Sequence, residues 1–256
     1  MQAWQLASVA FFAYVALAAI AISRIERATR LRVFGGVSLG FAFVAASIAL
    51  PESAIARVWI LPPLILFCGY WSSGGLFVEP MPSVEMMLER FDAALKIDRL
   101  AARTPRLLAE VVEVAYSAVY PIVPIALWIA LRHGASADRF WNVVVITDYV
   151  CFALLPWIQT RPPRAFRVGE PWQSLWRRVN VRMLGATSIQ VNTFPSGHAA
   201  EGLAAALLVS GAPAWVQACM GLTAGAISAG AVLGRYHYAV DAITGWIVAL
   251  TVWLLL

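Results

Sequence analysis

Long apolar segments limit what this chain can fold into more than any other feature of its sequence. A helix needs about 20 residues, at 1.5 Å each, to cross a bilayer. Hydrophobic residues make up 61% of the 256-residue chain and charged residues only 13%, which leaves too little polar surface for a water-soluble globule. The sequence therefore predicts an all-α, polytopic membrane protein. The predicted spans are eight: residues 3–23, 33–50, 57–78, 108–131, 140–159, 197–212, 214–233 and 238–256.

The spans are read as a single membrane domain covering residues 1–256, because no repeat, linker or low-complexity tract divides it. Residues 1–56 hold two additional spans, and residues 57–256 form a core. The apolar run at 3–23 has no basic region before it and no small-residue cleavage site after it, so we expect a first span and not a signal peptide.

Residues 83–102 are predicted to form an amphipathic helix at the membrane interface. Val84, Leu88 and Phe91 belong to an apolar helical stripe, and the charged residues fall largely elsewhere. Ser83 is a plausible N-cap. A solvated helix packed on the protein is the alternative.

The distribution of basic residues among the loops predicts how the protein is oriented in the membrane. With eight spans, the loops after spans one, three, five and seven share one side, and they hold sixteen of the nineteen Lys and Arg residues. Only Arg57, Arg132 and Arg139 lie opposite. The positive-inside rule places the charged side, with the candidate active site, in the cytoplasm.

The net charge of +5 does not indicate a nucleic-acid partner, because the arginines flank apolar spans, where membrane lipid headgroups or a substrate phosphate are nearer partners.

Cys68, Cys151 and Cys219 lie apart in apolar stretches and are expected to be small buried hydrophobes. No spacing suggests a disulfide framework or a metal site, so no cofactor is predicted. The oligomeric state is open.

His198 ends the sequence Pro-Ser-Gly-His and opens an apolar helix. Ser196 is a natural cap, Gly197 permits close backbone approach, and the free N–H groups of a helix start bind anions. His198 would then point at a bound anion. A capping turn followed by an incidental histidine is the alternative.

His237 precedes Asp241 by four residues at the edge of the last span. That spacing makes the two side chains neighbours on a helix, and an ionisable pair at a membrane edge is costly unless it has a task. A carboxylate on one imidazole nitrogen leaves the other nitrogen free to attack. A structural pair joining helices is the alternative. The third histidine, His133, has no such partner and is read as an interfacial side chain.

Arg161, Arg164 and Arg235 flank the late spans on the same predicted side. Guanidinium groups grip phosphate oxygens and stabilise the charge that develops in phosphoryl transfer. Each arginine alone is more often topological, but together with two histidines they suggest phosphate chemistry.

The ordered blocks Arg-Pro, Pro-Ser-Gly-His and His-x-x-x-Asp make the chain resemble the type 2 phosphatidic acid phosphatase superfamily over residues 57–256. The resemblance implies a six-helix core and metal-free catalysis. It implies that His237 is the nucleophile, Asp241 its orienting partner and His198 the acid that protonates the leaving oxygen. The residues implied to bind the substrate phosphate are Arg161, Ser196 and Gly197.

Two departures from the usual family pattern affect the subfamily. Leu154 stands where a lysine is usual and Ala231 where an arginine is usual, so Arg164 and Arg235 are predicted to substitute. The Pro-Pro-Arg turn, the R-Y-H-Y-x-x-D block and the two extra spans are similar to the branch containing inositolphosphorylceramide synthases.

Three functions follow. The leading one is hydrolysis of a lipid phosphomonoester or pyrophosphate through a phosphohistidine. The second is transfer of a phospho-headgroup to an alcohol. The third is a noncatalytic, transporter-like membrane protein in which His198, His237 and Asp241 line a proton or ion path. The acids Glu113, Asp148 and Glu201 would suit such a path, and they would equally suit headgroup binding.

Overall fold

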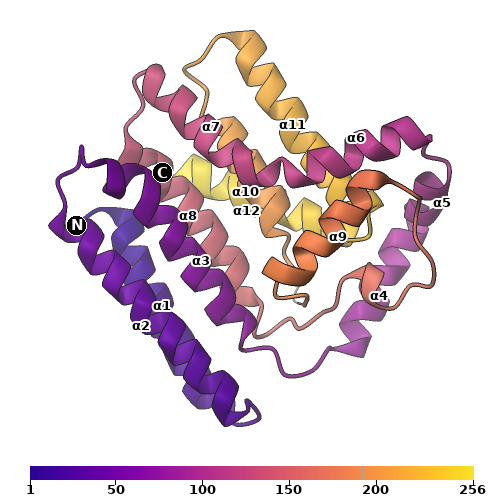
Figure 1. Ribbon diagram of the computed structural model, residues 1–256, viewed down its shortest axis with the longest axis horizontal. Helices are drawn as coiled ribbons and strands as arrows, with labels where there is room; N and C mark the ends of the chain where they lie inside the picture. The colour runs from indigo at the N-terminus through magenta and orange to yellow at the C-terminus, as the bar shows by residue number, and fades with distance from the viewer. Residues whose placement is uncertain (192) are drawn as a thin grey trace.

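The computed structural model describes residues 1–191 and 193–256, and among these it contains helices and loops but no strand (Figure 1). The all-α prediction is confirmed. The elements in chain order are α1 (Ala3–Ala21), α2 (Arg27–Ala49), the π-helical turn η1 (Ala56–Ile60), α3 (Leu61–Gly74), α4 (Pro82–Ala94), α5 (Ile97–Ala102), α6 (Arg106–Ser117), α7 (Val119–Arg132), α8 (Ala137–Leu154), the 3-10 turn η2 (Pro163–Ala165), α9 (Leu175–Thr187), α10 (Gly197–Leu207), α11 (Ala214–Leu233) and α12 (Ala239–Leu255).

Helix α10 is the centre of the bundle and packs against α7, α8, α11 and α12. Its buried side chains are small, with Ala199, Ala200 and Ala204 fully covered. Small residues let membrane helices approach closely, which raises the van der Waals contact that holds them together. At the edge of the bundle, at the lower left of Figure 1, α1 and α2 form a long hairpin. The Phe12 ring of α1 occupies the space that a side chain at Gly40 of α2 would need.

The structure has fewer candidate membrane spans than the eight predicted. Among the described residues, three helices are long and apolar enough to cross a membrane: α1, α2 and α11. If α6 and α7 together form one span, the number of candidate spans is four. The predicted single helix 108–131 is wrong, because α6 and α7 meet at a bend of 60°. Pro121 explains the break, since it has no N–H to bond the carbonyl four residues earlier, at Ser117.

The outer surface of these helices is apolar. Leu17, Leu222 and Leu254 are each about two-thirds exposed or more, as expected where lipid and not water is the solvent. Cys68 and Cys151 are buried as predicted, but Cys219 is exposed on α11. The prediction of burial is wrong for Cys219 because an apolar side chain that faces lipid need not be covered by protein.

The amphipathic segment forms two helices, α4 and α5, and the predicted cap is wrong. Helix α4 begins at Pro82 with Met81 as its N-cap, in keeping with the preference of proline for the first helical turn. Ser83 lies inside the helix. The apolar stripe is divided between two faces, because Met87 and Phe91 are exposed and face away from the protein whereas Leu88 is buried.

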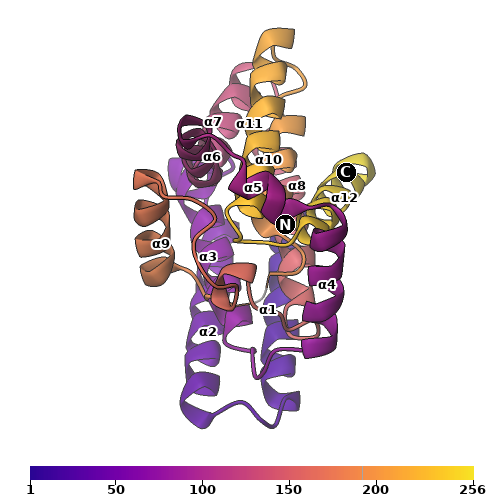
Figure 2. The same ribbon diagram turned by 90° about the vertical axis from the view of Figure 1, so that its right-hand side faces the viewer.

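The inward face of α4 carries Glu85, Leu88 and Asp92, all buried. Glu85 pairs with Arg161 at 2.8 Å and Asp92 with Arg167 at 3.0 Å, both in the loop after α8. Figure 2 shows α4 and α9 on opposite sides of the molecule.

Contacts between loops gather the basic segments at one end of the bundle. Arg24, after α1, forms an ion pair of 2.6 Å with Glu79, after α3. Arg235, after α11, pairs with Asp98 of α5 at 2.9 Å. These ion pairs join the loop after α1 to the loop after α3, and the loop after α11 to α5.

Candidate active site

The start of α10 places His198 with one ring nitrogen free. Ser196 is the N-cap, and its Oγ accepts a hydrogen bond from the Ala199 N–H at 3.3 Å. The His198 ring stacks on Tyr116, with centroids 5.0 Å apart and planes 7° from parallel. Its buried Nε2 has no hydrogen-bond partner among the described residues. A buried polar atom without a partner costs free energy, so this nitrogen is suited to a ligand.

His237 lies just before α12 and is held through its Nδ1. That atom is 2.9 Å from the Thr193 carbonyl oxygen and 3.5 Å from Asp241 Oδ2. A carbonyl oxygen can only accept, so Nδ1 carries the hydrogen and Nε2 has the free lone pair. The sequence analysis identified Asp241 but missed Thr193, because a backbone carbonyl leaves no signal in residue type.

Asp241 is fully buried and has a second role at the start of α12. Its Oδ2 accepts from the Tyr238 N–H at 3.0 Å, which caps the helix. Its Oδ1 has no partner among the described residues. The carboxylate therefore both fixes the helix start and places negative charge beside His237.

The two histidine motifs are joined directly. The Ser196 N–H donates to the Asp241 carbonyl oxygen at 3.0 Å, and the rings of His198 and His237 have centroids 5.7 Å apart. Gly245 permits this approach, because a Cβ there would lie 2.5 Å from the Ser196 carbonyl oxygen. Residues some forty positions apart thus converge on one site.

Of the three predicted arginines, the structure brings Arg164 to this site. Its guanidinium lies 5.2 Å from the centre of the Tyr236 ring and donates to Gln190 at 3.3 Å. No carboxylate pairs with it among the described residues, and burial lowers the pKa of its guanidinium. A half-buried cation without a counter-charge is a suitable anion site.

Arg161 and Arg235 are instead held by carboxylates. Arg161 donates to Glu85 through Nε at 3.0 Å and Nη2 at 2.8 Å. Burial alone raises the pKa of the Glu85 carboxyl, but the hydrogen bonds and charge of Arg161 hold it below its usual value, so the pair stays ionised at neutral pH. Arg235 binds Asp98 and donates to the Gly169 carbonyl at 3.0 Å. Their predicted role in phosphate binding remains a prediction.

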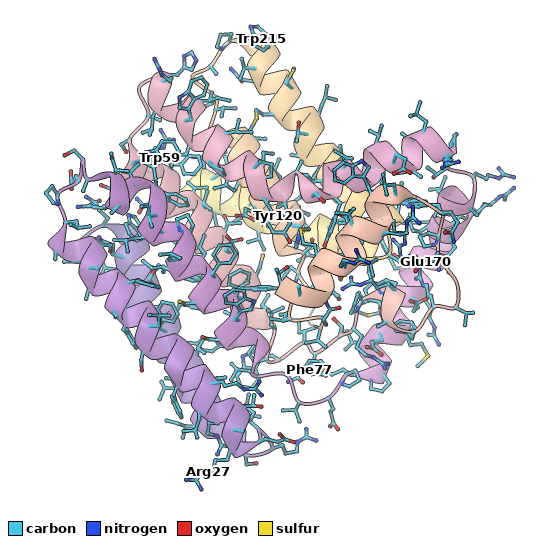
Figure 3. The ribbon with its side chains drawn as sticks, viewed as in Figure 1. Arg27, Trp59, Phe77, Tyr120, Glu170 and Trp215 are labelled. Atoms are coloured by element: carbon cyan, nitrogen blue, oxygen red, sulfur yellow. The ribbon has the colours of Figure 1, made fainter. Side chains whose placement is uncertain are left out.

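A cavity of about 650 Å³ joins the site to the interior of the bundle. Figure 3 labels Trp59 and Tyr120, two of its lining residues. Arg161, Ser196, Arg235 and Asp241 are not among the lining residues. The residues that line its polar end are Arg164, Thr193, Gly197, His198 and His237.

The three intramembrane acids have different settings. Asp148 and Glu201 line the cavity. Glu113 does not, because its carboxylate accepts hydrogen bonds from neighbouring side chains and is fully buried. Its partners are Trp172 at 2.9 Å, Arg177 at 3.2 Å, Asn180 at 2.8 Å and Tyr236 at 2.7 Å. Glu113 therefore serves packing of α6 against α9.

His133 ends α7 and lines a separate cavity of about 230 Å³. Within residues 1–191 and 193–256, no group of three or more His, Cys, Asp or Glu side chains is placed to hold a metal ion.

A family model described as the PAP2 superfamily matches residues 87–255, well over half of the chain. The chain therefore belongs to the PAP2 superfamily, and the resemblance inferred from its motifs is confirmed. The matched range includes both histidine motifs and leaves α1 to α3 outside. Membership supports an enzyme of the phosphatase or phosphotransferase type, and the apolar helices fit a membrane protein. No curated protein and no solved structure matches the chain.

Proposed function

We propose that this protein is a membrane lipid phosphate phosphatase that works through a phosphohistidine at His237. The observation that carries the proposal is the free Nε2 of His237 beside the free Nε2 of His198. Thr193 and Asp241 both face Nδ1 of His237, so the lone pair on its Nε2 can attack phosphorus. The second imidazole is then available for proton transfer.

The reaction has two steps. His237 Nε2 attacks phosphorus, the bond from phosphorus to the lipid oxygen breaks, and that oxygen takes a proton from His198 Nε2. Water then attacks the phosphohistidine while His198 removes its proton, which releases inorganic phosphate and restores His237. Asp241 stabilises the positive charge on His237 in both steps.

The substrate phosphate is bound where positive charge and free donors meet. The start of α10 offers the N–H groups of Gly197 and His198, and Arg164 supplies a cation at the same end of the cavity. Arg161 and Arg235 stay in the proposed set, although each is paired with a carboxylate and neither lines the cavity. The apolar remainder of the cavity accounts for a lipid as substrate.

Phosphate release from lipid phosphates in detergent tests the proposal. We expect turnover with phosphatidate or a polyprenyl pyrophosphate, and we expect it to persist in EDTA, because no group of His, Cys, Asp or Glu side chains among the described residues is placed to hold a metal ion. Activity lost in EDTA and restored by one divalent ion would refute the metal-free mechanism. A phosphodiester lipid together with an alcohol acceptor tests the second candidate, because a headgroup transferase moves the phosphate with its headgroup to the alcohol, forms a new phosphodiester and releases no inorganic phosphate.

We expect His198→Ala to lose about 10²- to 10⁴-fold in turnover of alkyl phosphates, the usual contribution of general acid catalysis. An aryl phosphate such as p-nitrophenyl phosphate needs little protonation of its leaving oxygen, so the same variant should lose much less with it. Steady-state kinetics with both substrates measures the difference. Equal losses would count against the acid role.

We propose that the active site faces the cytoplasm, because the loops that the eight-span prediction puts on its side hold sixteen of the nineteen basic residues. Single cysteines at Ala28 and Val168 test this in a cysteine-free background, since both positions are exposed in those loops. A membrane-impermeant maleimide applied to intact cells should leave both unlabelled. Ser53, exposed in a loop predicted on the opposite side, is the control and should label. The reverse pattern would put the site outside.

A further inference from the structure

Two acidic side chains of the cavity have no part in the proposed reaction. Asp148 belongs to the middle of α8 and is 4% exposed, and Glu201 belongs to α10. Both line the same cavity as His198 and His237. Neither carboxyl has a hydrogen-bond or ion-pair partner within residues 1–191 and 193–256. Asp148 is buried and Glu201 is partly exposed towards the cavity. Acids so far from bulk water and without partners are costly, so a ligand that compensates them is expected.

Helices α8 and α10 fix the distance between the two acids and the polar end of the cavity, where the substrate phosphate is proposed to bind. Glu201 follows His198 by three residues, which is about 4.5 Å along α10. Helices α8 and α10 pack against each other, and the two carboxyls are close enough to interact electrostatically. The two acids therefore lie together one helical turn deeper than His198.

Aromatic rings share this section of the cavity. Phe152 lies one helical turn after Asp148, and its ring centroid is 5.7 Å from that of Tyr70. Tyr120 lines the cavity from α7, with its ring edge toward His198 at 6.3 Å. Carboxylates together with aromatic faces are the combination that binds organic ammonium groups.

The remainder of the cavity is apolar and long. Its lining on α8 extends from Leu155 through Phe152 and Asp148 to Trp141, roughly 20 Å at the rise of an α-helix. The lining thus changes along the cavity from a cation at Arg164 to the two acids and then to apolar side chains. A ligand that matches this order has a phosphate, a cation next to it and a hydrocarbon chain beyond.

We propose that Asp148 and Glu201 form a subsite for a protonated amine that the lipid substrate carries between its phosphate and its hydrocarbon chain. The inference rests on the proposed function for the phosphate end of the cavity. It adds a specificity that the histidine motifs do not contain. An amine in a headgroup, attached to the phosphate on the side away from the hydrocarbon chain, would not reach Asp148 and Glu201 while that chain occupies the apolar part of the cavity.

Two matched lipids test the subsite. One is a long-chain 1-phosphate with a primary amine on the second carbon, and the other has a hydroxyl group in place of that amine. The wild-type protein should favour the amine by about tenfold or more in kcat/KM, mainly through KM. Equal kcat/KM for the two lipids would overturn the proposal. Such equality is expected if the two carboxyls only share a proton with each other and bind no amine.

The double variant D148N/E201Q should bring the ratio between the two lipids close to one. It keeps side-chain shape but removes both negative charges, so hydrolysis of the hydroxyl lipid should persist. Glu26→Gln, an exposed acid at the start of α2, is the matched control and should leave the preference unchanged. A preference that survives in D148N/E201Q would also overturn the proposal.

Binding separates a failure of this inference from a failure of the proposed function. If neither lipid is hydrolysed, the phosphatase assignment is wrong, but both lipids can still be titrated into His237→Ala in detergent by calorimetry. Tighter binding of the amine lipid supports the subsite independently of turnover. Equal binding of both lipids refutes it.

Discussion

Replacing His237 with alanine is expected to lower turnover of lipid phosphates by about 10⁴-fold or more, the scale on which removal of a nucleophile acts. No other side chain among the described residues offers a nucleophilic nitrogen held from behind by a carbonyl and a carboxylate. Rapid acid-free quenching of the wild type with a ³²P-labelled substrate should trap a base-stable, acid-labile phosphoenzyme. The alanine variant should form none.

The fold should survive this substitution. His237 contributes one hydrogen bond to the Thr193 carbonyl, and the net contribution of such a bond is about 1 kcal/mol. His133→Ala, at the end of α7 and outside the active-site cavity, is the matched control and should keep wild-type turnover. Turnover of the His237 variant within tenfold of wild type would mean that the nucleophile has been misassigned.

The sequence predicted the helical class and the convergence of the two histidine motifs because each depends on a strong local signal. An apolar run must be buried in lipid or protein, and the serine cap before His198 and the four-residue spacing of His237 and Asp241 are both visible in the sequence. Helix ends depended on weaker signals. The break between α6 and α7 follows from Pro121, but proline is also tolerated in membrane helices, so sequence alone did not decide it.

The arrangement of charge was less predictable. In α4, Glu85 and Asp92 are buried against the protein, whereas Met87 and Phe91 are exposed. The sequence shows that the helix has an acidic face and an apolar face, but it does not show which of the two faces packs against the protein. The pairing of Arg161 with Glu85 follows from that orientation and joins residues 76 positions apart. Such contacts depend on tertiary packing, which a pattern along the chain does not contain.

Replacing Asp241 with asparagine is expected to lower turnover by about 10³-fold. The Thr193 carbonyl already holds Nδ1 of His237, so the tautomer should survive and the loss should come from charge alone. At the observed 3.5 Å, two unit charges interact by about 5 kcal/mol at an effective dielectric constant of 20, and each 1.4 kcal/mol changes a rate tenfold.

Asparagine and alanine at this position separate charge from capping. Asparagine keeps an oxygen that can accept from the Tyr238 N–H, whereas alanine removes the cap, which costs about 1 kcal/mol of stability. Both variants should lose turnover to a similar degree, but only Asp241→Ala should lower the midpoint of thermal unfolding in detergent. If Asp241→Asn loses less than tenfold in kcat while its phosphoenzyme still forms at the wild-type rate, then Asp241 is a helix cap, and Thr193 alone positions the nucleophile.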